Sequence, residues 1–267
     1  MKGNALIRTT TALGAMLTLA CAQPALAQTA PYTPDPTVME VTTGSEISIA
    51  RLPDGVYLRD VNDPDDIIWD RIPAYRIGLL AAPPMHPSTQ LRYDPQKNGH
   101  VYFQLARTSD RFYVRMRWPD TTQNRAETVN TFSDGAAIQF ALNGEDTNFM
   151  MGTGPDKPVN IWYWKASRHD IQNLAAGGFG STTTLPDQVV TGKATYHADE
   201  PGQNQYWHLV MSRELDVSGD HQIDLRSGVV PLSFALWQGE DGQRDGNKVI
   251  NMGWVLVNVD PAADDTQ

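Results

Sequence analysis

FYVRMRW, the stretch at residues 112–118, decides the fold class of this chain. Its apolar residues at positions 112, 114, 116 and 118 alternate with Tyr113, Arg115 and Arg117, so that the apolar side chains share one face of an extended chain. The alternation therefore predicts a β-strand with one buried face.

Similar short runs fill much of the rest of the chain. They occur at residues 101–106, 136–142, 159–164, 206–211, 232–237 and 254–259, and turn signals such as Asn143-Gly144, Asp241-Gly242 and Asp245-Gly246 lie between them. Helical periodicity is weak, and we expect only short helical pieces near residues 67–70 and 170–174. Many strands, frequent turns and no βαβ alternation predict an all-β fold, an antiparallel β-sandwich with a few short helices. Such a fold presents its sites in loops at the ends of the sandwich or between its sheets.

The first 27 residues have the features of a secretory signal peptide. Lys2 and Arg8 precede a mainly apolar run at residues 11–20, and residues 25–27, Ala-Leu-Ala, form an A-x-A-like cleavage site. The apolar run is shorter than the roughly 20 residues that cross a bilayer. We therefore expect a mature chain that begins at Gln28, is exported to the periplasm and is not inserted in a membrane.

The chain has a single cysteine, Cys21, and cleavage after Ala27 would remove it. The mature protein would then have no disulfide, no C-x-x-C-H motif for covalent haem and no thiolate for an iron–sulfur cluster. Its stability in an oxidising compartment would depend on the core alone. Lipidation of Cys21 is the alternative, although residues 18–20 stand in a poor order for a lipoprotein site.

The mature chain is expected to be acidic. Loss of Lys2 and Arg8 changes the formal net charge from −10 to −12, which argues against nucleic acid and anionic lipid as partners and admits a cationic protein. Residues 28–44 are rich in Pro, Thr and Ala and are expected to form an extended or disordered arm. No repeat or linker divides residues 45–267, so we expect them to form a single domain.

Two clusters carry side chains suited to a cofactor. The first spans residues 140–164 and contains Phe-Met-Met-Gly at residues 149–152 and an aromatic run at residues 158–164. Core packing alone accounts for such residues in many proteins, whereas a thioether beside aromatic rings can ligate the iron of a buried flat cofactor. If Met150 and Met151 lie in a strand, only one of them can face inward.

The second cluster, residues 237–254, is a loop rich in Gly and Asp that contains Lys248. A lysine in such a loop is ordinarily a solvated charge. The histidines are scattered without metal-ligand spacing, and each is expected to be a surface or hydrogen-bonded residue: His86, His100, His169, His197, His208 and His221.

Read together, four segments resemble the haem-binding gamma subunits of the ethylbenzene dehydrogenase type. These segments are residues 133–140, 149–152, 158–164 and 237–254. Such subunits accompany periplasmic molybdenum enzymes that include dimethyl sulfide dehydrogenase, selenate reductase and chlorate reductase, and the likeness leans toward the dimethyl sulfide dehydrogenase type. It covers the chain from about Trp69 to Trp254.

The resemblance implies one haem b, held noncovalently between a methionine and a lysine. The methionine maps to Met151, with Met150 as the fallback, and the lysine maps to Lys248. A histidine in place of the lysine is the main alternative for that ligand. The implied partners are a molybdenum-containing catalytic alpha subunit, an iron–sulfur beta subunit and a soluble c-type cytochrome as electron acceptor. The chain itself would be an electron-transfer subunit of a heterotrimer, with no catalytic site of its own.

A lysine ligand carries an energetic cost. Lysine donates to iron only as the neutral amine, and with an ordinary pKa of about 10.4 its deprotonation at pH 7 costs about 4.6 kcal/mol. The iron–nitrogen bond and burial have to exceed that cost. Two protein ligands leave no open position for substrate, which favours electron transfer over catalysis. Lys165, Arg168 and Arg244 flank the clusters and could pair with haem propionates, or remain solvated.

Two other functions stay open at this point. A carbohydrate-binding module would present Trp162, Trp164 and Trp237 as a solvent-facing platform, whereas a haem site buries most of them. A glycoside hydrolase would need a pair of acids that sequence spacing alone does not reveal. No G-x-S-x-G, Walker, H-E-x-x-H or dinucleotide motif is present in the sequence.

Overall fold

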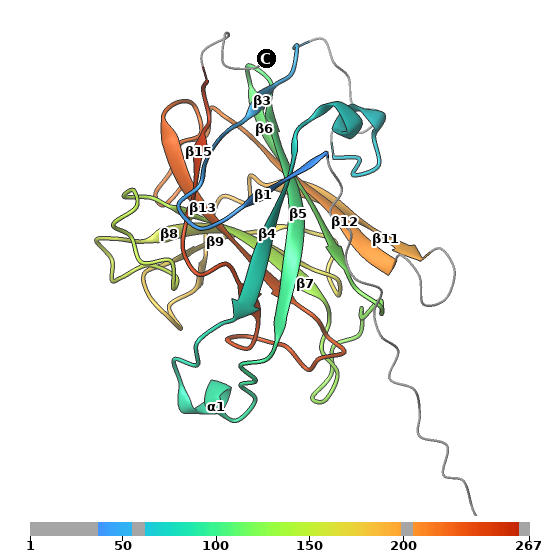
Figure 1. The fold of residues 1–267 in the computed structure, drawn as a ribbon. Coiled ribbons are helices and arrows are strands. Elements are labelled where there is room, and N and C mark those ends of the chain that lie inside the picture. Colours follow the sequence, from blue (N-terminus) through green and yellow to red (C-terminus); the bar gives the residue numbers. More distant parts are fainter. Residues whose placement is uncertain (1–36, 55–61, 199–204, 262–267) are drawn as a thin grey trace, which may run out of the picture. The chain divides into compact units, whose positions relative to one another are not determined.

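The computed structural model describes residues 37–54, 62–198 and 205–261 (Figure 1). These residues contain strands β1 to β15 and two short helices. The predicted signal peptide at residues 1–27 and residues 28–36 of the predicted arm lie outside the described residues. The all-β fold class is confirmed.

The elements follow one another along the chain, with long connections between several of them, such as those before β7 and before β8. Their bounds are β1 (Val38–Val41), β2 (Glu46–Ser48), β3 (Ala50–Arg51), η1 (Ile67–Arg71), β4 (Ala74–Ala81), α1 (Pro87–Gln90), β5 (Asn98–Arg107), β6 (Arg111–Pro119), β7 (Gly135–Ala141), β8 (Val159–Lys165), β9 (Gln172–Ala176), β10 (Thr183–Thr184), β11 (Thr191–Ala198), β12 (Gln205–Glu214), β13 (Val229–Trp237), β14 (Val249–Ile250) and β15 (Val255–Asn258).

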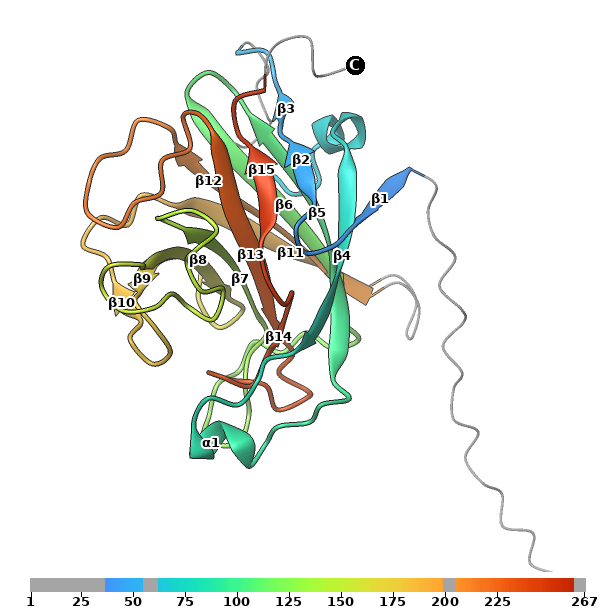
Figure 2. The ribbon, with the colours of Figure 1, turned by 60° about the vertical axis from the view of Figure 1, so that its left-hand side comes forward.

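The strands form a continuous sheet in the order β10-β9-β8-β7-β13-β14-β4-β5-β6-β12-β11. Neighbours along this path are antiparallel, while β1, β2 and β3 add to it in parallel beside β4, β15 and β5. The short strand β14 joins the half that contains β7, β8 and β13 to the half that contains β4, β5 and β6, and the two halves face each other as layers (Figure 2).

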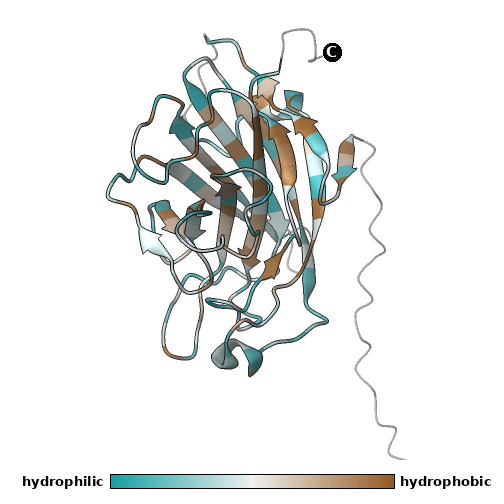
Figure 3. Cartoon of the chain, turned by 90° about the vertical axis from the view of Figure 1, so that its left-hand side faces the viewer, coloured by the Kyte–Doolittle hydropathy of each residue, from teal (hydrophilic) through white to brown (hydrophobic). Residues whose placement is uncertain are grey.

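Aromatic rings hold the two layers together. Phe103 of β5 lies 4.6 Å from Phe234 of β13, measured between ring centroids, and Phe112 of β6 lies 6.0 Å from Trp162 of β8. Trp162 is fully buried. Rings at these separations attract one another beyond the area that they bury. The main core therefore lies between the layers, and apolar residues follow the strands while α1 is largely hydrophilic (Figure 3).

Strand β6 bears out the alternation that predicted the fold. Phe112, Val114, Met116 and Trp118 are all buried in the main core, whereas on the opposite face Arg115 is half-buried and Arg117 is exposed. Tyr113 departs from the expectation of one buried face, because it is buried on that opposite face in a smaller apolar cluster.

Two local expectations turn out differently. Residues 170–174 were expected to be helical, but β9 begins at Gln172 and pairs with β8, so this prediction is wrong. Asn173 lies in the middle of β9, fully buried, and accepts a hydrogen bond of 2.8 Å from Asn160, a long-range contact that overrides the weak local pattern. At the other end, β1 pairs with β4, so the sheet begins at Val38, before the expected start of order at Ser45.

Both helices of the described residues are short. The helix η1 forms where a helical piece was expected near residues 67–70, and the Asp66 side chain caps it by accepting a hydrogen bond from the Ile68 amide. Neither η1 nor α1 is long and apolar enough to span a bilayer.

We expect Trp162→Ala to lower the free energy of unfolding by about 3–5 kcal/mol, because the substitution empties the space of an indole between the layers. Urea unfolding followed by circular dichroism measures the change. The exposed Val129→Ala serves as the control and should stay within about 0.5 kcal/mol of the wild type. A loss below about 1 kcal/mol in Trp162→Ala would contradict the central role of this ring.

Candidate functional site

A cavity of about 590 Å³ lies on the face of β7, β8 and β13 that points away from the main core. Its floor consists of alternate residues of those strands, among them Ala137, Gln139, Ile161, Tyr163, Ala235 and Trp237. Loops at residues 149–151, 179–182 and 243–248 contribute its walls. Its volume falls in the range of about 300–1,000 Å³ that is common for cofactor sites.

The methionine pair lies in a tight turn rather than in a strand. The Met150 amide donates to the Asn148 side chain at 2.8 Å, and the Gly152 amide donates to the Asn148 carbonyl at 2.8 Å. Met151 has a positive φ of 70°, an uncommon conformation for a residue with a side chain. Because the segment is a turn, the alternation of a strand does not apply to it, and Met150 and Met151 both line the cavity.

Contacts from other segments hold this turn in place. Gln139 on the cavity floor donates to the Phe149 carbonyl at 2.8 Å, and the Gly178 amide donates to the Met151 carbonyl at 2.7 Å. Gly152 also has a positive φ, and a Cβ there would lie 2.6 Å from the Lys157 carbonyl oxygen, so the position requires glycine. Of the two methionines, Met151 packs against the apolar cluster beneath the cavity.

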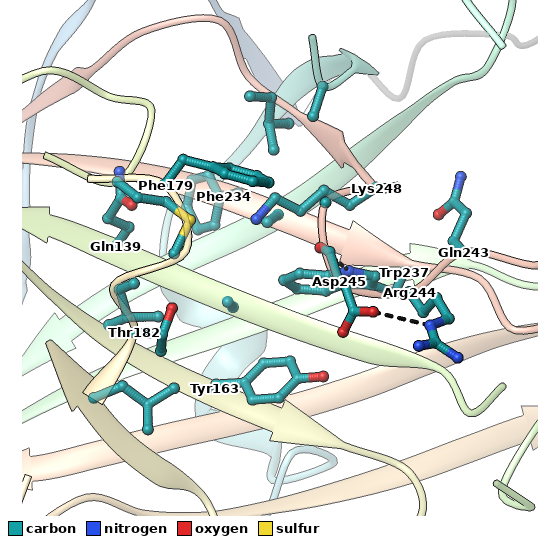
Figure 4. Close-up of a pocket in the computed structure, with 18 of the residues that line it drawn as sticks. Gln139, Tyr163, Phe179, Thr182, Phe234, Trp237, Gln243, Arg244, Asp245 and Lys248 are labelled. Atoms are coloured by element: carbon teal, nitrogen blue, oxygen red, sulfur yellow. Dashed lines mark hydrogen bonds and ion pairs between the residues drawn. The ribbon is translucent and has the colours of Figure 1, made fainter. Parts of the chain in front are cut away.

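Lys248, which belongs to the second cluster at residues 237–254, also lines the cavity. Its Nζ lies 4.9 Å from the centroid of the Trp237 ring, and its side chain reaches toward Phe179 and Phe234 (Figure 4). No hydrogen bond or ion pair joins this ammonium to any of the described residues. The adjacent Asp245 carboxylate is instead held by Arg244, with 2.9 Å between Nε and Oδ2.

This environment makes the amine of Lys248 unusually easy to deprotonate. Burial lowers the pKa of Lys248 to about 8, and the charge of Asp245 opposes the shift only in part. At pH 7 the neutral amine then costs about 1.4 kcal/mol, compared with about 4.6 kcal/mol for an ordinary lysine. At pH 7 the neutral amine is therefore a minor state of low energetic cost, in a cavity that two thioethers also line.

A buried aspartate, Asp134, anchors the loop that carries Lys248, and a second buried aspartate, Asp120, interacts with Asp134. Asp134 accepts hydrogen bonds from the Gly239 amide at 2.9 Å, from the Asn124 amide at 2.8 Å and from the Trp207 indole at 3.1 Å. Burial and the charge of Asp134 raise the pKa of Asp120 to about 7, and burial also raises the pKa of Asp134. Below about pH 7 we therefore expect the pair to retain a proton, mainly on Asp120.

The flanking cations divide into two groups. Lys165 and Arg244 line the cavity, where Lys165 pairs with Glu127 and Arg244 pairs with Asp245. Arg168 is not among the lining residues and pairs with Asp170 at 3.3 Å. The cavity therefore has two cationic side chains besides Lys248 among the residues that line it.

The remaining candidates of the sequence lie elsewhere. None of the six histidines, all of which are described, lines the cavity. Trp162 and Trp164 are buried in the main core and Trp237 is only 8% exposed, so these three residues form no solvent-facing platform.

Sequence reasoning missed Phe179, whose ring covers part of the cavity. The run Gly-Gly-Phe-Gly at residues 177–180 is the signal that could have pointed to it, because glycines allow the backbone to approach closely there. A Cβ on Gly177 would lie 2.7 Å from the Gly154 carbonyl oxygen. The loop that carries Phe179 thus packs directly against the segment that follows the methionine turn.

Three known proteins are similar to this chain over most of its length. The family model described as ethylbenzene dehydrogenase matches residues 66–184. The chain is 45% identical over 218 residues to dimethylsulfide dehydrogenase subunit gamma of Rhodovulum sulfidophilum, which covers 81% of this chain and 82% of that protein. It is 32% identical over 197 residues to chlorate reductase subunit gamma of Ideonella dechloratans, covering 73% of this chain and 78% of that protein. It is 30% identical over 190 residues to a candidate respiratory nitrate reductase heme subunit of Haloferax mediterranei. That alignment covers 70% of this chain and 65% of that protein.

Among solved structures, the chain aligns with a family 9 carbohydrate binding module from Caldicellulosiruptor kristjanssonii. The alignment covers 82% of this chain and 98% of that chain, with 14% sequence identity and a TM-score of 0.43. A likeness of this degree is too slight to bear on function.

We expect the free energy of unfolding to contain a contribution from Asp120 that decreases as the pH rises from about 4 to about 7. In this window the folded chain retains a proton that the unfolded chain has released, so a higher pH favours unfolding. Asp120→Asn should lack this decrease, because its amide can donate to Asp134 at every pH.

Urea unfolding of both proteins at several pH values between 4 and 8 tests this expectation. The exposed Asp156→Asn is the matched control and should follow the wild type. Parallel pH profiles for the wild type and Asp120→Asn would show that the two carboxyl groups share no proton.

Proposed function

This chain belongs to the ethylbenzene dehydrogenase family, together with gamma subunits of molybdenum enzymes, and from this membership we propose that it is a haem-binding electron-transfer subunit. The observation that carries the proposal is the cavity itself, which is lined by Lys248, by the thioethers of Met150 and Met151 and by several aromatic rings. A neutral amine and a thioether are donors that haem iron accepts.

The side chains that line the cavity fit such a group. Lys248 has a lowered pKa and no hydrogen-bond or ion-pair partner among the described residues, so an added iron ligand would satisfy its amine without breaking an existing contact. Lys165 and Arg244 supply the charges that carboxylate propionates require. No histidine lines the cavity, which favours Lys248 over histidine as the second ligand.

We assign Met151 as the methionine ligand, with Met150 as the fallback. Met151 packs on the apolar floor, and hydrogen bonds to its carbonyl and within the turn fix its backbone. When bound, such a haem would supply one-electron transfer. Because two protein ligands leave no iron position for substrate, it would not itself bind the substrate. The chain's own residues then orient the group and exclude water from it, while substrate chemistry takes place on another subunit.

The finer features of the proposal follow from the sequence. With Cys21 removed in a signal peptide, the haem would be a noncovalent haem b in a periplasmic protein. The gamma-subunit relatives support a partnership with a molybdenum-containing alpha subunit and an iron–sulfur beta subunit, in a complex that oxidises dimethyl sulfide. A soluble c-type cytochrome would accept the electrons.

We expect Met151→Ala and Lys248→Ala each to abolish the six-coordinate low-spin spectrum, since each substitution removes one axial ligand. Absorption spectra of the oxidised and dithionite-reduced proteins, with a pyridine haemochrome assay, measure the change. Matched controls are Met252→Ala and Lys193→Ala, neither of which lines the cavity. An unchanged spectrum in Lys248→Ala would refute that ligand, and loss of the spectrum in Met150→Ala but not in Met151→Ala would transfer the methionine role.

We also expect the affinity of the haem-free protein for haem to fall by up to about tenfold per pH unit below about pH 8. The lysine pKa is lowered to about 8, so below this value haem has to displace a proton from the amine. Spectroscopic titrations between pH 6 and 9 measure the affinity. In Lys248→His the decrease should begin at a lower pH, because imidazole is neutral above about pH 6.5. Identical profiles for both proteins would argue against coordination by Lys248.

A further inference from the structure

A second group of donor atoms lies outside the cavity, on the β11–β12 pair at the end of the sheet. Asp65, His197 and His208 each offer one ligand atom, and these atoms all lie within 4.8 Å of one another. Asp65 Oδ1 is 2.9 Å from His197 Nε2 and 2.7 Å from His208 Nδ1. Two imidazoles and a carboxylate form the donor set that zinc and related divalent ions take up in proteins.

The backbone arrangement keeps these donors together without a ligand. In the register of β11 and β12, Thr195 lies opposite His208 and His197 lies opposite Tyr206, so the two histidines are diagonal neighbours on one face of the pair. Their ring centroids are 4.9 Å apart, and the His197 ring also stacks on Tyr206. Asp65 reaches them from the loop before η1.

The two spacings that involve Asp65 need little adjustment to accept an ion. The ligand atoms of the two histidines lie within 4.8 Å of each other and would have to take up the same tetrahedral spacing. Zinc bonds of about 2.0–2.1 Å in a tetrahedral site place the donor atoms about 3.3 Å apart. The Asp65 oxygen would therefore move about half an ångström away from each imidazole nitrogen. The side chains of Asp65 and His197 are 36% and 29% exposed, so solvent can supply a fourth ligand on the open side.

Arg115 is the one cation that contacts the group among the described residues, and its position is compatible with an ion. Its Nη2 lies 3.2 Å from His208 Nδ1 and 3.5 Å from His208 Nε2. A point nearly equidistant from both ring nitrogens lies over the ring face, because in the ring plane it would collide with the carbon between them. The guanidinium is held there by the Pro64 carbonyl and the Gln104 side chain, so it does not occupy the in-plane position at Nδ1. That position is taken by the hydrogen bond between Nδ1 and Asp65 Oδ1, and an ion would replace the proton of this bond.

We propose that Asp65, His197 and His208 bind a divalent transition-metal ion of the zinc type, with water as the fourth ligand. Burial lowers the pKa of His208 to about 4, and hydrogen bonds from the histidines help to lower the pKa of Asp65, so both groups have the protonation state that a metal requires. The positive charge of Arg115 weakens the site relative to one built from the same donors alone.

The bound ion would stabilise the edge of the sheet at β11. Strand β11 is the last strand of the path and pairs with β12 alone, so one side of its backbone has no strand partner among the described residues. An ion shared by β11, β12 and the loop that carries Asp65 would fasten that loop to the sheet edge. This role does not depend on a haem in the cavity, because the ligands come from different elements.

Isothermal titration of Zn²⁺ into the full mature protein, purified with its partners removed and its haem retained, tests the proposal. We expect one equivalent to bind, with an affinity at least tenfold weaker in His197→Ala and in Asp65→Asn. His169→Ala, an exposed histidine outside the group, is the matched control and should bind as the wild type does. Circular dichroism and the haem spectrum report that each variant is folded.

Two results would overturn the proposal. One is wild-type Zn²⁺ binding no tighter than that of His197→Ala, and the other is a tight site that survives in both His197→Ala and Asp65→Asn. Because the readout is Zn²⁺ affinity, the outcome is independent of whether Lys248 and Met151 bind haem. X-ray absorption at the zinc edge should give nitrogen and oxygen ligands only.

Discussion

Burial of strands β7 and β8 on both faces is the constraint on which the rest of the structure depends. One face, with Phe140 and Trp162, closes the main core, while the other face, with Ala137 and Ile161, forms the floor of the cavity. An antiparallel sheet commonly leaves one face to solvent, so a second apolar face needs a cover. The three wall loops supply part of that cover. The cavity lies between them, and the candidate ligands line it.

Much of the fold could be predicted from local pattern, because alternation in β6 is a property of neighbouring residues. The likeness to ethylbenzene dehydrogenase-type gamma subunits, inferred from segments of the sequence, is confirmed by the family comparison. The conformation of the methionine turn was beyond sequence reasoning, since it depends on contacts with Gln139 and Gly178. The strand at residues 172–176 was missed for the same reason: its partners, such as Asn160, are distant in sequence.

Burial acts on acids and bases in opposite directions, and this protein uses both effects near one loop. At Asp120 and Asp134 it favours the protonated acid, and Asp134 accepts the hydrogen bond of the Gly239 amide. At Lys248 it favours the uncharged amine. The acidic surface of the chain does not reverse this effect, because Arg244 engages the nearest carboxylate, Asp245. Burial, and not the net charge of the chain, thus lowers the pKa of the lysine.

The wall loops of the cavity come from widely separated parts of the chain, and this has a consequence for biogenesis. Lys248 and Trp237 lie near the C-terminal end, whereas Ala82 and Pro83, which also line the cavity, belong to the first third of the sequence. During synthesis the growing chain therefore has no complete pocket until β13 and β14 have emerged and paired. Binding of the proposed haem would then be a late step of maturation, since a chain that ends ahead of β13 lacks both Trp237 and Lys248.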